Sequence, residues 1–386
     1  QKNEVKLQEQ LAESKQCEVQ LQEKLDSSKE DIQKSQEELQ HANEKLEAQK
    51  KELNLLRDQL VAAQRTIQKW EEDSTPFGIE KFQESDEDIH FYTGLPDYTS
   101  FVALYEYLDP GEDGANVKRH QGNCGNLTRR GQRRKISSSN ELFLVLMKLR
   151  LGLFHRHLGH LFSVSKSTVS RIFSAWTDYM YLQLARLPLW QSRNAINATM
   201  PDAFLERYSS TRVILDATEI RCDVPTSFVT QSELYSHYKS THTVKGLVGV
   251  APSGVLTFVS ELFTGGTSDR ECVIKSGFLD LQFDEGDSIM ADKGFLIEDL
   301  MQGKGVAVNI PPFLRSRQFT AEEVEKTQAI AALRIHVERR IQRIKGFHIF
   351  DRSLPISLVP LANQMWTICA ILTNFQGALI AESDDT

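Results

Sequence analysis

Residues 1–75 contain no proline or glycine and carry a seven-residue repeat of large aliphatic side chains. Eight of its nine positions are aliphatic, with Glu18 as the exception: Leu11, Glu18, Leu25, Ile32, Leu39, Leu46, Leu53, Leu60 and Ile67. A second, weaker seam occupies Leu7, Ser14, Leu21, Ser28, Ser35, Ala42, Gln49, Leu56, Ala63 and Trp70. Two seams at this spacing predict a coiled coil, and with it a homo-oligomer, with a long solvated single helix as the alternative. Isoleucine occupies only two positions of the strong seam, which leaves the number of paired helices open.

The charge of the chain is distributed unevenly. The formal net charge is −8, and residues 1–75 contribute −5 of it, from 12 basic and 17 acidic residues. In contrast, residues 118–135 hold seven basic residues and no acidic one. Because the distribution of charge decides nucleic-acid binding more than its sum does, this stretch predicts contacts with the phosphates of double-stranded DNA. The predicted contacts are Arg129, Arg130, Arg133, Arg134 and Lys135. The alternative is a solvated linker. The stretch could also be a nuclear localisation tract, a role that is compatible with DNA contacts and with a linker and that predicts the nucleus as the compartment.

The cysteines and the apolar stretches exclude several classes of protein. The five cysteines are scattered and form no Cys-x-x-Cys pair, which predicts neither a disulfide framework nor a zinc site. The longest apolar stretches, at 142–147 and 365–372, are too short to span a bilayer, and no signal peptide is visible. We therefore expect no membrane partner. The chain begins at Gln1 rather than methionine, so we expect the natural N-terminus to lie upstream.

A helical region follows the coiled coil. We expect 76–136 to be a linker with a short helix at 97–108 and the basic stretch. Residues 137–200 are expected to form a helix-turn-helix, with helices at 140–151, capped by Ser138 or Ser139, at 155–162 and at 166–181. The start of the third helix is predicted to face DNA through Lys166, Ser167, Thr168 and Arg171. Any three-helix bundle shows a similar pattern, so this remains one of two interpretations.

From about residue 211 the pattern changes to short apolar runs. Runs at 213–215 and 288–291 each lead into an aspartate, Asp216 and Asp292, and 243–263 has the pattern of a hairpin. Helices are expected at 321–345 and 357–375. Strands followed by long helices predict a mixed α+β domain, a sheet flanked by helices, over 201–378. Residues 379–386 are expected to be a disordered acidic tail.

The two aspartates carry the expected chemistry. Two neighbouring strands that each end in an aspartate would bring both carboxylates to one edge of a sheet. Like charges held close together repel, and a divalent cation relieves the repulsion. Magnesium suits such a site because it binds a few carboxylates and keeps positions open for water and phosphate, and manganese is an alternative.

A third acid is expected from the helix at 321–345. Glu338 lies among five cations, and Ile335, Val337, Ile341 and Ile344 are expected to mark the packed side of the helix. The neighbouring cations are Arg334, Arg339, Arg340, Arg343 and Lys345. Glu338 could simply be their salt-bridge partner. If it completes a metal site, cations such as Arg339 and Arg343 would hold DNA phosphates.

Four motifs, in order and with fitting intervals, make the chain resemble a Harbinger-like eukaryotic DDE transposase with an attached helix-turn-helix. They are Leu215-Asp216-Ala217-Thr218-Glu219-Ile220, Gly265-Gly266-Thr267-Ser268-Asp269, Ala291-Asp292-Lys293-Gly294-Phe295 and Arg334-Ile335-His336-Val337-Glu338-Arg339. Tyr238-Lys239, Thr243-Val244-Lys245 and Asn309-Ile310-Pro311-Pro312-Phe313 are also similar to that family. The similarity runs from about Phe91 to Phe375 and leaves the coiled coil outside.

The resemblance implies an RNase H-like fold with Asp216, Asp292 and Glu338 as the catalytic, metal-binding triad. Asp269 matches a further acid that the family keeps, and is expected to be either a metal ligand or a helix cap. Many relatives have Gly, Thr and His where this chain has Ala217, Thr218 and Glu219, a departure that leaves all four acids in place. The implied reaction is cleavage and transfer of DNA strands by two-metal phosphoryl transfer, with no covalent enzyme intermediate. A second transposon-encoded DNA-binding protein is a further partner of this family.

Three functions remain as alternatives at this point. The first is a metal-dependent DNA endonuclease and transposase. The second is a domesticated transposase that binds DNA without catalysis. The third is a coiled-coil scaffold whose C-terminal half is only structural.

Overall fold

A computed structural model describes residues 2–74, 76–118, 134–314, 318–377 and 379. The chain divides into two compact units, Gln1–Thr75 and Pro76–Thr386. Of the residues expected to contact DNA, Arg129, Arg130 and Arg133 lie outside the described residues, as does nearly all of the expected acidic tail.

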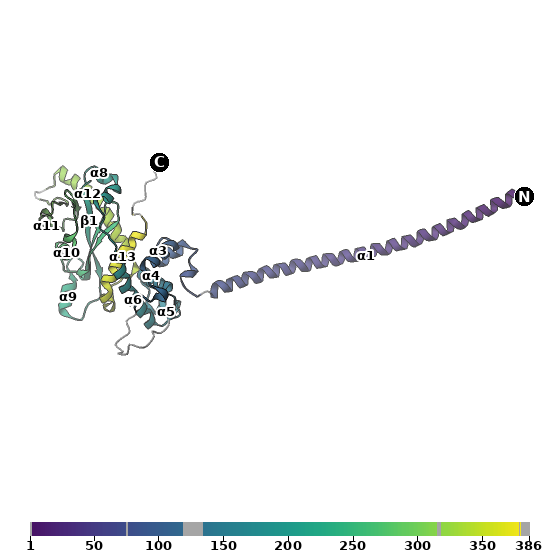
Figure 1. Ribbon diagram of the computed structural model, residues 1–386, viewed down its shortest axis with the longest axis horizontal. Helices are drawn as coiled ribbons and strands as arrows, with labels where there is room; N and C mark the ends of the chain where they lie inside the picture. Colours follow the sequence, from purple (N-terminus) through teal and green to yellow (C-terminus); the bar gives the residue numbers. More distant parts are fainter. Residues whose placement is uncertain (1, 75, 119–133, 315–317, 378, 380–386) are drawn as a thin grey trace. The chain divides into compact units, whose positions relative to one another are not determined.

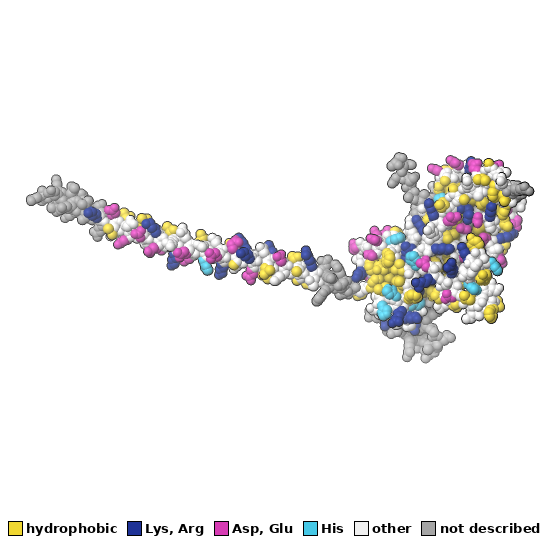
Figure 2. Space-filling model, turned by 180° about the vertical axis from the view of Figure 1, so that it is seen from behind, with side chains coloured by type: hydrophobic (Ala, Val, Ile, Leu, Met, Phe, Trp, Pro, Cys, Tyr) yellow, Lys and Arg dark blue, Asp and Glu magenta, His cyan; other side chains and the backbone are white. Residues whose placement is uncertain are grey.

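The first unit is a single helix, α1 (Lys2–Ser74), of 73 residues (Figure 1). This confirms the helix predicted by the repeat. From Leu25 to Ile67 the strong-seam side chains are 50–64% exposed, because nothing in the chain's first unit covers them. Figure 2 shows hydrophobic side chains recurring along the helix between basic and acidic ones. Pairing of α1 with another helix stays a prediction.

The second unit begins with helices. They are η1 (Ile79–Lys81), α2 (Asp86–Thr93), α3 (Tyr98–Leu108), η2 (Glu112–Gly114), α4 (Ser138–Leu151), α5 (His155–Leu161), α6 (Lys166–Leu184), α7 (Arg193–Ala198) and α8 (Asp202–Leu205). The three helices predicted for the helix-turn-helix are confirmed as α4, α5 and α6. The cap of α4 differs from the prediction, since Ser137 rather than Ser138 or Ser139 accepts the backbone N–H of Asn140.

The segment before α4 is more than a linker. Ile89 on α2 and Phe101 and Leu104 on α3 are at most 2% exposed and belong to the same apolar core as Phe143 on α4. This burial is the reason that 76–118 folds with the helices that follow it. A local apolar pattern could not show this, because the partner surface lies about 40 residues further along the chain.

A seven-stranded mixed sheet follows. Its strands are β1 (Thr211–Arg221), β2 (Tyr235–Ser236), β3 (Thr241–Val250), β4 (Leu256–Val259), β5 (Phe263–Thr264), β6 (Ser288–Met290) and β7 (Ala307–Asn309). The order is β2-β3-β1-β6-β7, and β4 and β5 also pair with β3. Strand β1 is antiparallel to β3 and parallel to β6, which is parallel to β7. The predicted mixed sheet and the β3–β4 hairpin are therefore confirmed.

Helices cover the sheet (Figure 1). They are α9 (Phe228–Leu234), α10 (Asp269–Lys275), η3 (Phe278–Asp280), α11 (Glu298–Gln302), α12 (Ala321–Lys345), η4 (His348–Phe350), η5 (Ile356–Leu361), α13 (Ala362–Leu372) and η6 (Thr373–Phe375). Alternate residues of β1 enter two separate cores. Val213 and Leu215 pack with Val273 of α10, whereas Ile214 packs in the core that holds α12 and α13. Because side chains alternate along a strand, every second residue of β1, starting from Ile214, faces α12.

By length and composition alone, Ile356–Phe375 could cross a membrane. In the structure it is broken into η5, α13 and η6, and Met365, Trp366 and Ile368 are fully buried in the core. This burial identifies α13 as a core helix of the second unit.

Candidate functional site

Two parallel strands bring Asp216 and Asp292 to the same side of the sheet. Ile214 of β1 is the register partner of Met290 of β6, and each aspartate lies two residues further along its own chain. Because side chains two residues apart point to the same face of a strand, Asp216 and Asp292 both follow the face covered by α12. One detail differs from the prediction. Asp216 does not end its strand, since β1 continues to Arg221.

Arg334 of α12 lies between the two carboxylates. Its Nη1 is 3.2 Å from Oδ1 of Asp292 and its Nη2 is 3.5 Å from Oδ1 of Asp216. The Arg334 side chain is 12% exposed, and its Nε is buried with no hydrogen-bond partner. A single guanidinium therefore neutralises both acids from the helix that packs above them. The sequence placed Arg334 near Glu338 but carried no signal that it would reach across to strands more than 40 residues away.

Glu338 lies one helical turn after Arg334, on the same side of α12. It is exposed, and its charge is close enough to raise the pKa of Asp216. Within the described residues, however, no three Asp, Glu, His or Cys side chains are grouped so that they could hold a metal ion. The structure thus brings the three predicted acids into one electrostatic neighbourhood, with Arg334 rather than Glu338 bridging the aspartates.

The environment of Asp216 disfavours its negative charge. The pKa of Asp216 is raised to about 6, chiefly by burial and in smaller part by the nearby charges of Asp292 and Glu338. Arg334 and the backbone N–H of Ala217, 2.9 Å from Oδ1, act in the opposite direction. A further cation beside these acids would stabilise the ionised form of Asp216.

Asp269 is the first residue of α10, but it is not the helix cap. The hydroxyl of Ser268 fills that role by accepting the backbone N–H of Glu271. The carboxylate of Asp269 instead pairs with Nζ of Lys245, 3.1 Å away, and Lys245 lies 3.8 Å from the largely buried Glu219. A side chain at Gly294 would meet the Asp269 carboxylate, because a Cβ built there lies 2.7 Å from Oδ2. Asp269 therefore lies beside the turn that follows Asp292.

Lys245 pairs with Asp269 and lies near Glu219, but no role was predicted for it from the sequence. It lies opposite Glu219 in the β1–β3 register and also donates to the carbonyl oxygen of Thr267, 2.8 Å away. Cross-strand pairing of opposite charges was the available signal, but it depends on a register that the sequence does not show.

The helix α12 differs in part from the prediction. Ile335 was expected on the packed side but is 40% exposed, whereas Arg340 is 2% exposed. Arg340 donates to the carbonyl oxygens of Gly254 and Thr373 and so ties α12 to the β3–β4 turn and to η6. Arg343 donates to the carbonyl oxygen of Gly377, and Arg339 is exposed.

Most of the described residues expected to contact DNA are open to solvent. On α6, Lys166, Ser167 and Arg171 are exposed, and the hydroxyl of Ser165 caps the helix by accepting the backbone N–H of Thr168. The Thr168 hydroxyl is itself bonded to that of Ser165, 2.9 Å away. Lys135 is also exposed. Figure 2 shows separate groups of basic side chains on one face of the second unit.

Arg134 was expected to contact DNA, and in the structure its guanidinium is engaged within the protein. Its guanidinium pairs with the fully buried carboxylate of Glu141 and donates to the carbonyl oxygens of Gly114 and Val117. These contacts join η2 to α4, so Arg134 stabilises the helical region.

Two family models match the chain. Residues 215–374 match the DDE superfamily endonuclease, and residues 134–186 match the helix-turn-helix of the DDE superfamily endonuclease. The first segment contains Asp216, Asp292 and Glu338, and the second contains α4, α5 and α6. No curated protein matches the chain. The two matches support a DDE-type transposase with a DNA-binding region and an endonuclease domain.

Proposed function

We propose that this chain is a divalent-metal-dependent DNA endonuclease of the transposase type, with Asp216, Asp292 and Glu338 as its catalytic acids. One observation carries the proposal. The parallel register of β1 and β6 sets Asp216 and Asp292 side by side, facing the helix that supplies Glu338. This occurs within the segment that matches the endonuclease model.

The residues of the site fit a hard divalent cation. All of the candidate ligands are carboxylates, which Mg²⁺ and Mn²⁺ prefer over softer donors. Two of them already share one cationic group, and burial disfavours the charge of Asp216 unless a cation is near. Asp216, Asp292 and Glu338 would hold the metal, and Asp269 would join them only by leaving Lys245. Bound cations would supply the positive charge that phosphoryl transfer between oxygen atoms requires.

The protein's own groups would bind and orient the DNA. Lys166, Ser167 and Arg171 are exposed at the start of α6, which supports a role of α6 as the recognition helix. Lys135 and Arg339 offer exposed cations to the phosphate backbone. Arg334 would compete with a metal for the acid pair, because both are cations attracted by the same two carboxylates.

The test is cleavage of supercoiled DNA by the full chain. We expect cleavage with Mg²⁺, none with a chelator, and loss of cleavage in Asp292→Asn with DNA binding retained in a gel shift. The matched control is Asp280→Asn, an exposed acid on η3, which should cleave like the unaltered chain. Equal background cleavage in both variants would reject the endonuclease.

Replacing Arg334 by glutamine should tighten metal binding. The guanidinium competes with a cation for Asp216 and Asp292, so its removal should raise the affinity for Mn²⁺ by about tenfold. Calorimetric titration of the full chain measures this. Arg270→Gln, which breaks the pair of Arg270 on α10 with Asp299 on α11, is the control and should leave the affinity unchanged. Unchanged affinity in Arg334→Gln would show that the metal does not bind at the acid pair.

A second function is favoured by the same contact. Arg334 occupies the acid pair, and no three-acid metal cluster is formed among the described residues, as expected for a domesticated transposase that binds DNA without catalysis. That function predicts DNA binding by gel shift together with no calorimetric signal for Mn²⁺ and no cleavage.

Several finer assignments complete the proposal. Within the sheet the run of pairings β4-β3-β1-β6-β7, in which β3 is antiparallel to β4 and β1 and the other pairs are parallel, supports an RNase H-like fold. The four sequence motifs support the Harbinger-like type. The exposed seam of α1 supports self-association through a coiled coil.

The basic stretch at 118–135 supports a nuclear location, which imaging of a tagged chain would test. A second transposon-encoded protein remains a candidate partner, testable by co-purification.

A further inference from the structure

We propose that α1 pairs with α1 of a second copy of this chain in an antiparallel orientation, with Leu39 of one copy opposite Ser35 of the other. The inference rests on the self-association that forms part of the proposed function, and it adds the direction and register of the pair. Both follow from the sizes and charges of side chains that α1 leaves exposed.

The two seams of α1 differ in size. The strong seam carries large side chains at Leu25, Ile32, Leu39, Leu46 and Leu53, each at least half exposed. The weaker seam, three residues later, has small side chains at Ser28, Ser35 and Ala42. In a parallel pair each seam meets itself, so bulky layers alternate with layers too small to fill the space between the helices.

An antiparallel pair sets the large seam against the small one. With Leu39 opposite Ser35, the neighbouring layers become Ile32 with Ala42 and Leu46 with Ser28. Each of these layers then combines one large and one small side chain, so the volume per layer stays nearly constant. The outer layers are Leu25 with Gln49 and Leu53 with Leu21.

The charges beside the seams favour the same arrangement. In the antiparallel register Lys24 faces Glu52 and Asp31 faces Lys45, and symmetry repeats each pair. In a parallel pair Lys24 would approach Lys29, and Lys45 would approach Lys50, of the second copy. Within the described part of α1, none of these four antiparallel partners takes part in an ion pair within its own helix, so all are open to a second chain.

Two contacts between like charges oppose the antiparallel pair, and ion pairs within each helix reduce the repulsion in one of them. Lys29 would face Lys50, but each is neutralised within its own helix. Lys29 pairs with Asp26 at 3.1 Å and Lys50 pairs with Glu47 at 2.7 Å. The remaining unfavourable contact is Glu38 with its own copy at the centre of the pair.

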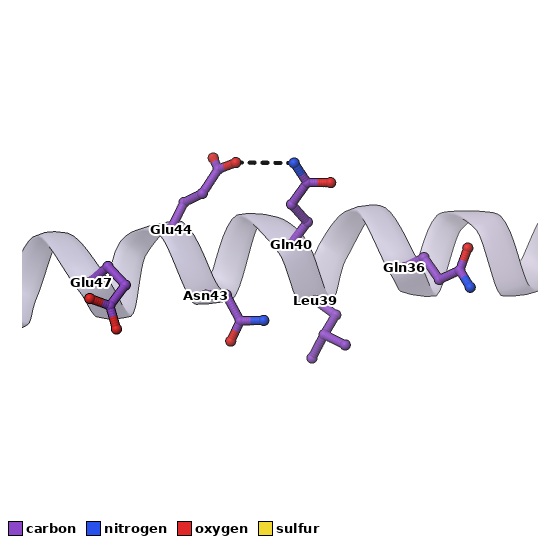
Figure 3. A pocket seen from close by; sticks show the side chains of 6 residues that line it. All are labelled: Gln36, Leu39, Gln40, Asn43, Glu44 and Glu47. Atoms are coloured by element: carbon purple, nitrogen blue, oxygen red, sulfur yellow. Dashed lines mark hydrogen bonds between the residues drawn. The ribbon is translucent and has the colours of Figure 1, made fainter.

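The centre of the proposed interface is visible in Figure 3. Leu39 and Asn43 project from one side of the helix, whereas Gln40 and Glu44 lie on the opposite side, joined by a hydrogen bond of 3.2 Å. The side with Leu39 is therefore available to the second copy. There Asn43 would face Gln36 of the second copy, and two amides can exchange hydrogen bonds.

The orientation has a consequence for the assembly. The chain segments that follow Ser74 would leave the antiparallel pair from opposite ends, about 110 Å apart at about 1.5 Å per residue over 73 residues. The antiparallel pair would therefore attach the two DNA-binding units at opposite ends of the paired helices.

A charge reversal distinguishes the two orientations by sign. Lys24→Glu in the full chain should weaken dimerisation by about tenfold if α1 is antiparallel, because the new carboxylate would face Glu52 in both symmetry-related contacts. Lys24→Glu with Glu52→Lys should restore it, and Lys51→Glu on the outer side should change nothing. Sedimentation measures the dimer dissociation constant. Tighter dimerisation in Lys24→Glu, where a parallel pair gains a Glu–Lys contact, would overturn the proposal.

Disulfide trapping gives a second readout. In a chain with Cys17→Ser and Cys124→Ser, the remaining cysteines Cys222, Cys272 and Cys369 are buried. Differently tagged copies with Leu21→Cys and Leu53→Cys should cross-link to each other and not to themselves, while Glu23→Cys mixed with Lys51→Cys should not cross-link. Self-linking of Leu53→Cys would overturn the antiparallel orientation while leaving self-association in place. A monomeric full chain would overturn both the orientation and the self-association, leaving the endonuclease proposal to its own test.

Discussion

Asp216→Asn is expected to abolish cleavage and to make the folded protein more stable. Loss of a carboxylate at the reacting centre should reduce Mg²⁺-dependent cleavage by about a thousandfold. Burial raises the pKa of Asp216 from its ordinary value of 3.8 to about 6, so at pH 8 the folded state carries a charge that the unfolded state solvates better. The rise from 3.8 to about 6 already includes the attraction to Arg334, and it corresponds to an expected gain of about 3 kcal/mol.

The sign of this gain depends on pH. Above about pH 6 the carboxylate is ionised in both states and the folded state bears the full cost. As the pH falls from about 6 towards 3.8, the folded state takes up its proton first, which relieves the cost. The advantage of Asp216→Asn should therefore be largest at pH 8 and nearly absent at pH 4. Urea unfolding with a chelator present measures it at both pH values.

Asp280→Asn is the matched control, because Asp280 is an exposed acid on η3. It should keep full cleavage and change the free energy of unfolding by less than about 0.5 kcal/mol. An Asp216→Asn protein that cleaves DNA like the control would remove Asp216 from the catalytic site. One that is less stable than the unaltered chain at pH 8 would show that the Arg334 contact outweighs the cost of burial.

Glu141→Leu is expected to cause the largest loss of stability in the helical region. Glu141 is fully buried and accepts the indole N–H of Trp176 at 2.8 Å while it pairs with Arg134. Leucine fits the apolar surroundings but removes the carboxylate that pairs with the Arg134 guanidinium and accepts the Trp176 indole N–H. Breaking a buried ion pair from one side costs about 3–5 kcal/mol. Thermal or urea unfolding of the full chain followed by tryptophan fluorescence would measure the change.

Glu106→Leu on α3 is the control for this substitution, since its side chain is exposed. We expect it to change the free energy of unfolding by less than about 0.5 kcal/mol. Glu141→Gln should fall between the two, because its amide oxygen can still accept the Trp176 N–H. A Glu141→Leu protein as stable as the Glu106→Leu control would show that the Arg134–Glu141 pair does not stabilise the fold.

The candidate site could be predicted in part from the sequence. The apolar runs before Asp216 and Asp292 indicated two strands, and both strands formed next to each other. The long helix was predicted at 321–345, which are the bounds of α12, because its period is a local feature; the structure adds the capping box of Thr320 and Glu323. Glu338 was expected either to complete a metal site with the aspartates or to pair with the cations beside it, and that choice stays a prediction. No local feature indicated that Arg334 would reach both aspartates.

Local periodicity was enough to determine the uninterrupted helix α1, the three helices α4 to α6, the hairpin and the helix α12, since each depends on residues a few positions apart. Only the tertiary structure decided that Arg334 bridges Asp216 and Asp292, that Lys245 holds Asp269, and that Arg134 is tied to Glu141. These contacts join parts of the chain that the sequence does not place relative to one another. A charged side chain pairs with the polar groups that burial would otherwise leave without a partner. Which groups are buried is decided by the packing of the whole molecule.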